Sequence, residues 1–214
     1  MSGRPFRIDF IADLCCPWCY VGWRALDQAL VARTDLAPTR HWGPYFLRPD
    51  TPPFGFDRAD YMRKLFDGAP ERARASRDAL LAAAADAGAT LNIDAAKVMP
   101  NTMDAHRLIH WATGQGLMAA AVDALFEAYF VDGRNIGDRD ELVALASSIG
   151  LDAVVVKDLL AGESDWTMLA NAHNAAVEAG VRGVPVTIMD GRRAHQGAET
   201  VAGYGRLIDA ALAA

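Results

Sequence analysis

The sequence lacks the features that would mark a membrane, secreted or nucleic-acid-binding chain. None of its apolar runs reaches the roughly 18 residues that a membrane-spanning helix needs. Residues 1–7 contain no apolar stretch with a small-residue cleavage site, so no secretory signal is expected. Acidic residues outnumber basic ones by 27 to 21, and the net charge of −6 disfavours a nucleic-acid partner. We therefore expect a cytoplasmic protein that binds neither membranes nor nucleic acid.

Cysteine is also scarce, and its distribution is informative. Only three cysteines occur in 214 residues, and all of them fall in one short segment, as Cys15, Cys16 and Cys19. A secreted disulfide scaffold would spread an even number of cysteines along the chain. A zinc site would need four ligands, and the sequence has no second cysteine pair or nearby histidine run, so no metal is expected. Clustered thiols in such a chain indicate redox chemistry.

The hydrophobic pattern places this cluster between a strand and a helix. Residues 6–12 alternate as a strand does, and an apolar stripe of helical period runs from 17 to about 33. Proline suits the first helical position, because its missing N–H is not needed there. Pro38 should end this stretch, and residues 41–47 predict a second strand. The chain therefore opens as strand, helix, strand.

A long helical block should follow. Residues 48–55 are rich in helix breakers and suggest a boundary. From about 57 to 180 the sequence has almost only helical character, and Asp138 with Glu141 resembles a capping box. Residues 154–156 could form a strand, but their neighbours fit a helical period better.

After the helical block the sequence changes from helical to strand-like character. Residues 184–189 and 193–196 predict two short strands, with Asp190-Gly191 as the hairpin turn between them. Residues 199–213 should form a closing helix. If the helical block is removed, the remaining order is that of a thioredoxin fold.

The spacing Cys16-Pro17-Trp18-Cys19 suits disulfide exchange. If the helix begins at Pro17, Cys16 is its N-cap, where unpaired backbone N–H groups stabilise a thiolate. Two intervening residues bring Cys19 back within one helical turn, so that it can resolve a mixed disulfide. Trp18 is expected to form an apolar platform for a peptide or aromatic substrate, with a cover for the helix start as the alternative. Two small core residues at a helix start are the alternative, which the strand–helix frame disfavours.

A second motif supports this context. Residues 180–185, G-V-R-G-V-P, lead into the late strand, and prolines at such positions occur as cis bonds in constrained turns. A cis Val184–Pro185 bond would turn the Val184 backbone toward Cys16, where it could pair with an extended peptide or with glutathione. A trans proline that starts a strand is the alternative.

Together these segments resemble the DsbA-like thioredoxin superfamily, and especially its FrnE-type branch. Residues 13–20, D-L-C-C-P-W-C-Y, are similar to its active-site segment, and residues 100–108, P-N-T-M-D-A-H-R-L, to its second characteristic stretch. Residues 129–136 resemble the turn of its helical domain, residues 180–185 its cis-proline loop, and residues 197–198 the turn before its last helix. The resemblance covers nearly the whole chain.

The resemblance implies an α/β protein, a thioredoxin fold with a large all-helical insertion. The thioredoxin-like domain would comprise residues 1–55 and 176–214, and the inserted helical domain residues 56–175. Thiol–disulfide oxidoreductase activity is implied, with a protein or small molecule that carries a thiol or disulfide as substrate. The resemblance implies no bound cofactor. It leaves open whether glutathione is a redox partner or a substrate, and whether the protein forms a homodimer.

The site residues implied are Cys16 and Cys19 for catalysis and Trp18, Val184 and Pro185 for substrate binding. The alternative is a glutathione-dependent isomerase or transferase, because 2-hydroxychromene-2-carboxylate isomerases and kappa-class glutathione transferases share the scaffold. Those enzymes typically carry serine at the position of Cys16, so the cysteine pair favours disulfide exchange.

Two features depart from the family pattern. Val186 follows the proline where the family usually has threonine, a change that bears on substrate contacts and not on the sulfur chemistry. Cys15 precedes the motif and is expected to be a buried small residue, with a regulatory thiol or a competing disulfide partner as alternatives. His106 is expected to form structural hydrogen bonds rather than to shuttle protons.

Overall fold

A four-stranded sheet forms the centre of the computed structural model, which describes residues 3–213. Its order is β2-β1-β5-β6, from β1 (Arg4–Ala12), β2 (Leu36–Pro44), β5 (Val186–Met189) and β6 (Arg193–Gln196). β2 runs parallel to β1, whereas β5 is antiparallel to both β1 and β6. Alternate residues of β1 are buried, as the sequence pattern predicts.

The sequence placed the second strand too late. β2 begins at Leu36 and includes Pro38, which lies opposite Phe6 of β1. Because β2 is an edge strand, a residue without an N–H is tolerated there. The predicted hairpin is confirmed, since Asp190 and Gly191 both have positive φ, 53° and 67°, in the turn between β5 and β6.

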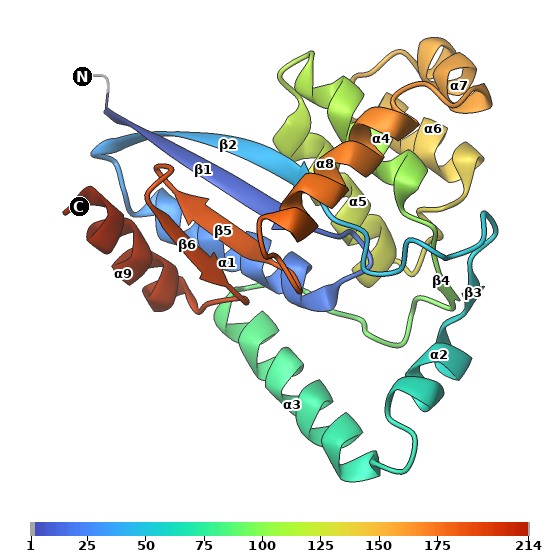
Figure 1. The fold of residues 1–214 in the computed structure, drawn as a ribbon, viewed down its shortest axis with the longest axis horizontal. Coiled ribbons are helices and arrows are strands. Elements are labelled where there is room, and N and C mark those ends of the chain that lie inside the picture. Colours follow the sequence, from blue (N-terminus) through green and yellow to red (C-terminus); the bar gives the residue numbers. More distant parts are fainter. Residues whose placement is uncertain (1–2, 214) are drawn as a thin grey trace.

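Two helices, one near each end of the chain, lie beside the sheet. α1 (Pro17–Val31) and α9 (Val201–Leu212) pack against each other on one face (Figure 1). Tyr204 and Ile208 of α9 are fully buried, which confirms the predicted apolar side of the closing helix. Short loops join β1 to α1 and β6 to α9.

The polypeptide between β2 and β5 is mainly helical. Its helices are α2 (Arg58–Leu65), α3 (Pro70–Asp86), α4 (Met103–Thr113), α5 (Met118–Phe130), α6 (Arg139–Ser148), α7 (Ala153–Ala161) and α8 (Trp166–Glu178). Asp138 and Asp152 cap α6 and α7 with their carboxylates, so the residues around Val155 are helical as expected. α2 and α3 leave the body as an arm (Figure 1). Among residues 3–213, no helix is both long and apolar enough to cross a bilayer.

The expectation of an all-helical insertion needs one correction. β3 (Phe56–Asp57) pairs with β4 (Val98–Met99) in a short antiparallel ladder. A ladder of two residues a strand has no periodicity that a sequence could display, because its pairing is set by tertiary contacts. The ladder ties the start of α2 to the segment before α4.

Candidate active site

Cys16 ends the segment between β1 and α1. Its φ and ψ, −91° and 113°, are extended, while its carbonyl accepts the first helical hydrogen bonds, from the N–H of Cys19 at 3.0 Å and of Tyr20 at 3.3 Å. Cys16 is therefore the N-cap of α1, as predicted. The first turn of α1 holds no acidic side chain, so nothing within it opposes the positive end of the helix dipole.

The surroundings of the other two thiols keep them protonated. Cys19 is fully buried, and burial together with the neighbouring Cys16 thiol raises the pKa of Cys19 well above its ordinary value. The Cys15 thiol donates to Asp13 Oδ2 over 3.3 Å. Burial, and after it the Asp13 charge, raises the pKa of Cys15 as well. All three cysteines are free thiols, and Cys16 is the one that caps α1.

The loop before β5 meets Cys16 from the side. The Val184–Pro185 bond is cis, as the sequence led us to expect. The Cys16 thiol donates to the Val184 carbonyl oxygen over 3.7 Å. Pro185 is buried against α1 at Gly22, where a Cβ atom would lie only 3.3 Å from Pro185 Cγ. Glycine at this position therefore allows the helix and the loop to approach closely.

A buried carboxylate lies behind the thiols. Asp13 is 1% exposed, and its Oδ2 also accepts the backbone N–H of Leu47 at 2.8 Å. Its Oδ1 faces His106 Nε2 at 3.5 Å, a long contact that is electrostatic rather than a close hydrogen bond. Burial works to raise the pKa of Asp13, but the groups around it, His106 first among them, lower it below its ordinary value.

The hydrogen bonds of His106 fix its tautomer. His106 Nδ1 accepts the indole N–H of Trp42 at 3.0 Å. The ring proton of a neutral imidazole must then be on Nε2, which points at Asp13. The expectation that His106 forms structural hydrogen bonds is confirmed by this bond. The network joins α4 to β2 and to the residue three positions before Cys16.

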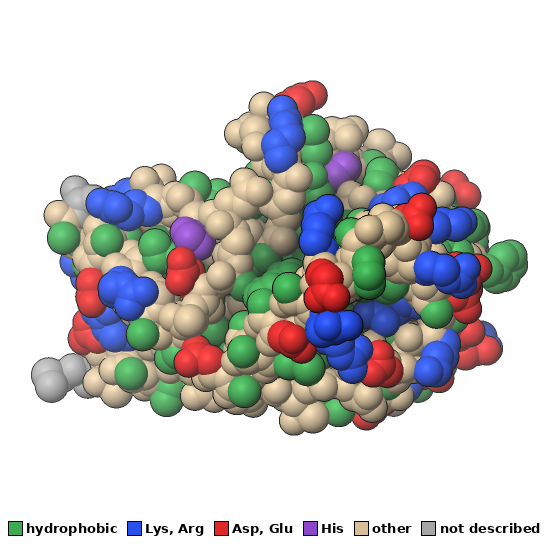
Figure 2. Space-filling view, turned by 90° about the horizontal axis from the view of Figure 1, so that it is seen from below, with side chains coloured by type: hydrophobic (Ala, Val, Ile, Leu, Met, Phe, Trp, Pro, Cys, Tyr) green, Lys and Arg blue, Asp and Glu red, His purple; other side chains and the backbone are tan. Residues whose placement is uncertain are grey.

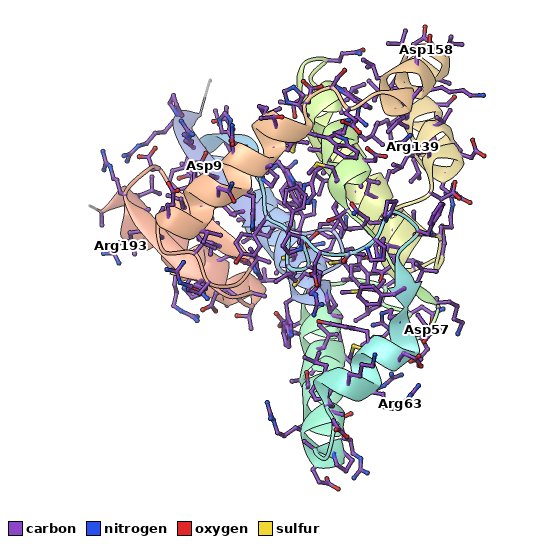
Figure 3. All side chains as sticks on the ribbon, turned by 45° about the vertical axis from the view of Figure 1, so that its right-hand side comes forward. Asp9, Asp57, Arg63, Arg139, Asp158 and Arg193 are labelled. Carbon is purple, nitrogen blue, oxygen red and sulfur yellow. The ribbon has the colours of Figure 1, made fainter. Side chains whose placement is uncertain are left out.

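A cleft of about 950 Å³ opens over the start of α1. Cys16 and Trp18 lie on one wall, and α2, α3 and the segment before β4 supply the others. Figure 3 shows Asp57 at the start of α2 and Arg63 further along it, both of which line the cleft. In Figure 2, hydrophobic side chains are visible in a hollow at the middle of the lower face, and charged side chains of both signs crowd the right-hand half. Such a cleft has the size of a small-molecule site.

Comparison with known proteins agrees with this architecture. Residues 7–208 match the family model of the DSBA-like thioredoxin domain. The chain belongs to this family.

Solved structures of similar fold cover nearly all of this DSBA-like chain. A probable DsbA oxidoreductase from Streptomyces coelicolor has a TM-score of 0.84 and 28% identity, over 97% of this chain and 90% of that one. Cytosolic disulfide reductase DsbM from Pseudomonas aeruginosa, solved with GSH, has a TM-score of 0.63 and 22% identity, over 97% and 96%. A 2-hydroxychromene-2-carboxylate isomerase has a TM-score of 0.68 and 18% identity, over 97% and 93%. The last two likenesses concern the fold alone.

The DSBA-like fold brings the residues singled out from the sequence to one end of α1. Cys16 and Trp18 line the cleft, and Cys19 is buried next to Cys16. Val184 and Pro185 border Cys16 at its side and are not among the residues that line the cleft. Of the three substrate-binding residues expected from the sequence, Trp18 therefore lines the cleft and the other two do not.

Sequence reasoning missed the cationic part of the cleft. Arg58 and Lys97 both line it, and they are far apart in the sequence. The backbone N–H of Arg58 donates to the backbone carbonyl of Lys97 at 2.9 Å, beside the β3–β4 ladder. No local signal marks either residue, because only the ladder brings them together.

Proposed function

We propose that this DSBA-like protein is a dithiol–disulfide oxidoreductase in which Cys16 is the nucleophile and Cys19 the resolving thiol. The observation that carries the proposal is the asymmetry of the pair. Cys16 is the N-cap of α1 and lines the cleft although it is only 5% exposed, whereas Cys19 is 0% exposed and does not line the cleft. A nucleophile must meet the substrate, while a resolving thiol needs to reach only the mixed disulfide.

In the reducing direction, the Cys16 thiolate attacks one sulfur of the substrate disulfide. The substrate S–S bond breaks, and the leaving sulfur departs with the electron pair as a thiolate. Cys19 then loses its proton to solvent and attacks the Cys16 sulfur, which releases the second substrate thiolate. The Cys16–Cys19 pair is oxidised by two electrons, and the substrate is reduced by two. Each step is reversible, so the same residues serve thiol oxidation.

The environment of each residue suits its role. The helix N-terminus stabilises negative charge on Cys16 before the attack and again when Cys16 is the leaving group. Burial raises the pKa of Cys19, so Cys19 stays protonated and does not compete for the first attack. The backbone of Val184, 3.7 Å from the Cys16 sulfur, is in place to pair with an extended substrate.

The proposal includes a cytoplasmic location and glutathione as a redox partner. A cytosolic disulfide reductase of similar fold, solved with GSH, is compatible with both. A glutathione-dependent isomerase remains the alternative on the same scaffold. The two thiols at the start of α1 favour disulfide exchange, because an isomerase has no use for a resolving thiol.

Trapping of mixed disulfides tests the roles. Pre-reduced Cys19→Ser should accumulate a stable adduct with oxidised glutathione, seen by intact mass spectrometry, because nothing resolves it. Cys16→Ser should form no such adduct, and Cys15→Ser, the matched control, should behave as the wild type. Adducts located on Cys15, or wild-type disulfide reduction by Cys16→Ser, would overturn the assignment.

A further inference from the structure

The charges that line the cleft are not balanced. Arg77 donates to both carboxylate oxygens of Asp94, at 2.9 and 2.5 Å. Arg58 instead donates to the Ile93 carbonyl at 2.9 Å, and Lys97 to the Asp94 carbonyl at 2.8 Å. Within residues 3–213, neither Arg58 nor Lys97 forms an ion pair. Two cations therefore border the cleft without a carboxylate at ion-pair distance. Asp94 is held by Arg77, and Arg77, Arg58 and Lys97 together lower its pKa.

The other charged groups of the cleft are engaged or distant. Arg63 and Arg74 pair with acidic residues one turn away on their own helices. The Asp57 carboxylate accepts the N–H of Asp60 at 2.7 Å as the cap of α2, and Asp67 lies in the exposed turn after α2. Among the described residues, none of these groups forms an ion pair with Arg58 or Lys97.

Of the two cations, Arg58 is the stronger indication of an anion-binding site, because it is half-buried. Burial raises the pKa of Tyr129, and the neighbouring Arg58 works in the opposite direction, which places the guanidinium next to that buried phenol. An unpaired charge in such surroundings is unfavourable, and an anion that binds beside it regains the interaction lost with water.

Much of the lining of the cleft is apolar. Leu65 and Leu47 are 54% and 37% exposed, and both line the cleft together with Phe66, Met62 and Trp18. Exposed apolar side chains gathered in a concave site of this volume are typical of a small-molecule pocket.

We propose that the cleft selects small organic disulfides and thiols that have an apolar, aromatic body and carry a carboxylate. The carboxylate binds Arg58 and Lys97, the body lies on Trp18 and the α2 side chains, and a sulfur reaches Cys16. This inference rests on the proposed function, because it assigns the substrate class of the same thiol pair.

The reaction with such a probe is balanced without any further reagent. The Cys16 thiolate attacks one sulfur of the aryl disulfide and releases one aryl thiolate. Deprotonated Cys19 then displaces the second aryl thiolate from Cys16. One protein dithiol is oxidised to a disulfide, and one aryl disulfide is reduced to two coloured thiolates.

The test compares two disulfides that differ only in charge. Pre-reduced protein reacts in a single turnover with 5,5′-dithiobis(2-nitrobenzoate) or with its neutral bis-carboxamide, and each rate is divided by that of dithiothreitol. This normalisation removes the intrinsic reactivity of each probe. We expect the normalised rate of the dianion to exceed that of the amide by about tenfold, as charge-assisted hydrogen bonds imply.

Four variants locate the preference. Arg58→Gln and Lys97→Gln should each lower the dianion-to-amide ratio severalfold, and the double variant should bring it near one. Arg72→Gln removes an exposed charge from α3 that does not line the cleft, and it should keep the wild-type ratio. Because Lys97 is exposed, its variant keeps the test valid even if Arg58→Gln fails to fold.

The outcomes separate this inference from the proposed function. If wild type and Cys16→Ser react alike with both probes, the proposed function fails and the substrate class with it. If Cys16 reacts but the ratio is near one, or is unchanged in both cleft variants, only the substrate class is refuted. A disulfide-bonded peptide with acidic side chains that reacts faster than either aryl probe, and depends on Arg58, would show that the occupant is a polypeptide.

Discussion

Replacing His106 with alanine should destabilise the protein by about 4 kcal/mol at neutral pH, because two buried polar groups lose their partners at once. The Trp42 indole N–H, 3.0 Å from His106 Nδ1, would have no acceptor, and an orphaned buried donor costs roughly 1–3 kcal/mol. Asp13 Oδ1, which has no close hydrogen bond within the described part of the chain, would also lose its electrostatic contact with Nε2 at 3.5 Å; leaving this buried group without a partner costs roughly a further 1–3 kcal/mol.

The penalty should depend on pH with a definite sign. In the wild type the pKa of Asp13 is lowered, so its stabilising effect is present above about pH 4 and is lost as the pH falls through the folded-state pKa. Without His106, burial should raise the pKa of Asp13 above the unfolded value. The variant then loses stability as the pH rises from about 4 through that raised pKa. The difference between the two proteins should therefore be smaller at pH 4 than at pH 7.

Urea denaturation followed by tryptophan fluorescence, with the thiols kept reduced, measures this difference. The matched control is His195→Ala, because His195 is half-buried and faces only Glu199, at 3.3 Å. An exposed pair of that kind is worth about 1 kcal/mol or less. A His106→Ala penalty no larger than the control's, or one independent of pH, would refute the account of this network.

Two further predictions concern other buried groups. Arg107 is fully buried, donates to Asp104 at 2.7 Å and binds two backbone carbonyls; Arg107→Met should cost about 3–5 kcal/mol in urea denaturation. The exposed Arg139 binds the same carboxylate at 2.8 Å, and Arg139→Met should cost about 1 kcal/mol or less. Because the pKa values of Cys15 and Cys19 are raised, the reduced protein should be fully stable below the unfolded thiol pKa of about 8.5 and should lose stability above it. Cys15→Ala should make that loss shallower by up to about 1.4 kcal/mol per pH unit, and an unchanged slope would contradict the assignment.

Features governed by local chemistry were predictable from the sequence. The alternation in β1, the helix start at Pro17 and the turn at Asp190-Gly191 each follow from a few adjacent residues. The cis bond at Pro185 followed from the motif and its resemblance to a family. The position of Cys16 at the helix N-cap therefore follows from the residues around it alone.

Features made by tertiary contacts were not predictable in the same way. Pro38 reads as a breaker, yet it fits β2 because that strand lies at the sheet edge. The contact of His106 with Asp13 joins α4 to the active-site segment, and no spacing in the sequence predicts this contact. Arg58 and Lys97 converge only through the β3–β4 ladder.

A redox titration of the three thiols shows whether Cys16 and Cys19 form one redox couple that leaves Cys15 out. The protein is equilibrated in buffers of graded reduced and oxidised glutathione, quenched with acid, alkylated, digested and mapped by mass spectrometry. The account predicts one two-electron transition in which a Cys16–Cys19 disulfide forms while Cys15 stays alkylated throughout. A disulfide that contains Cys15, or glutathione adducts on Cys16 that never give way to a Cys16–Cys19 bond, would contradict it.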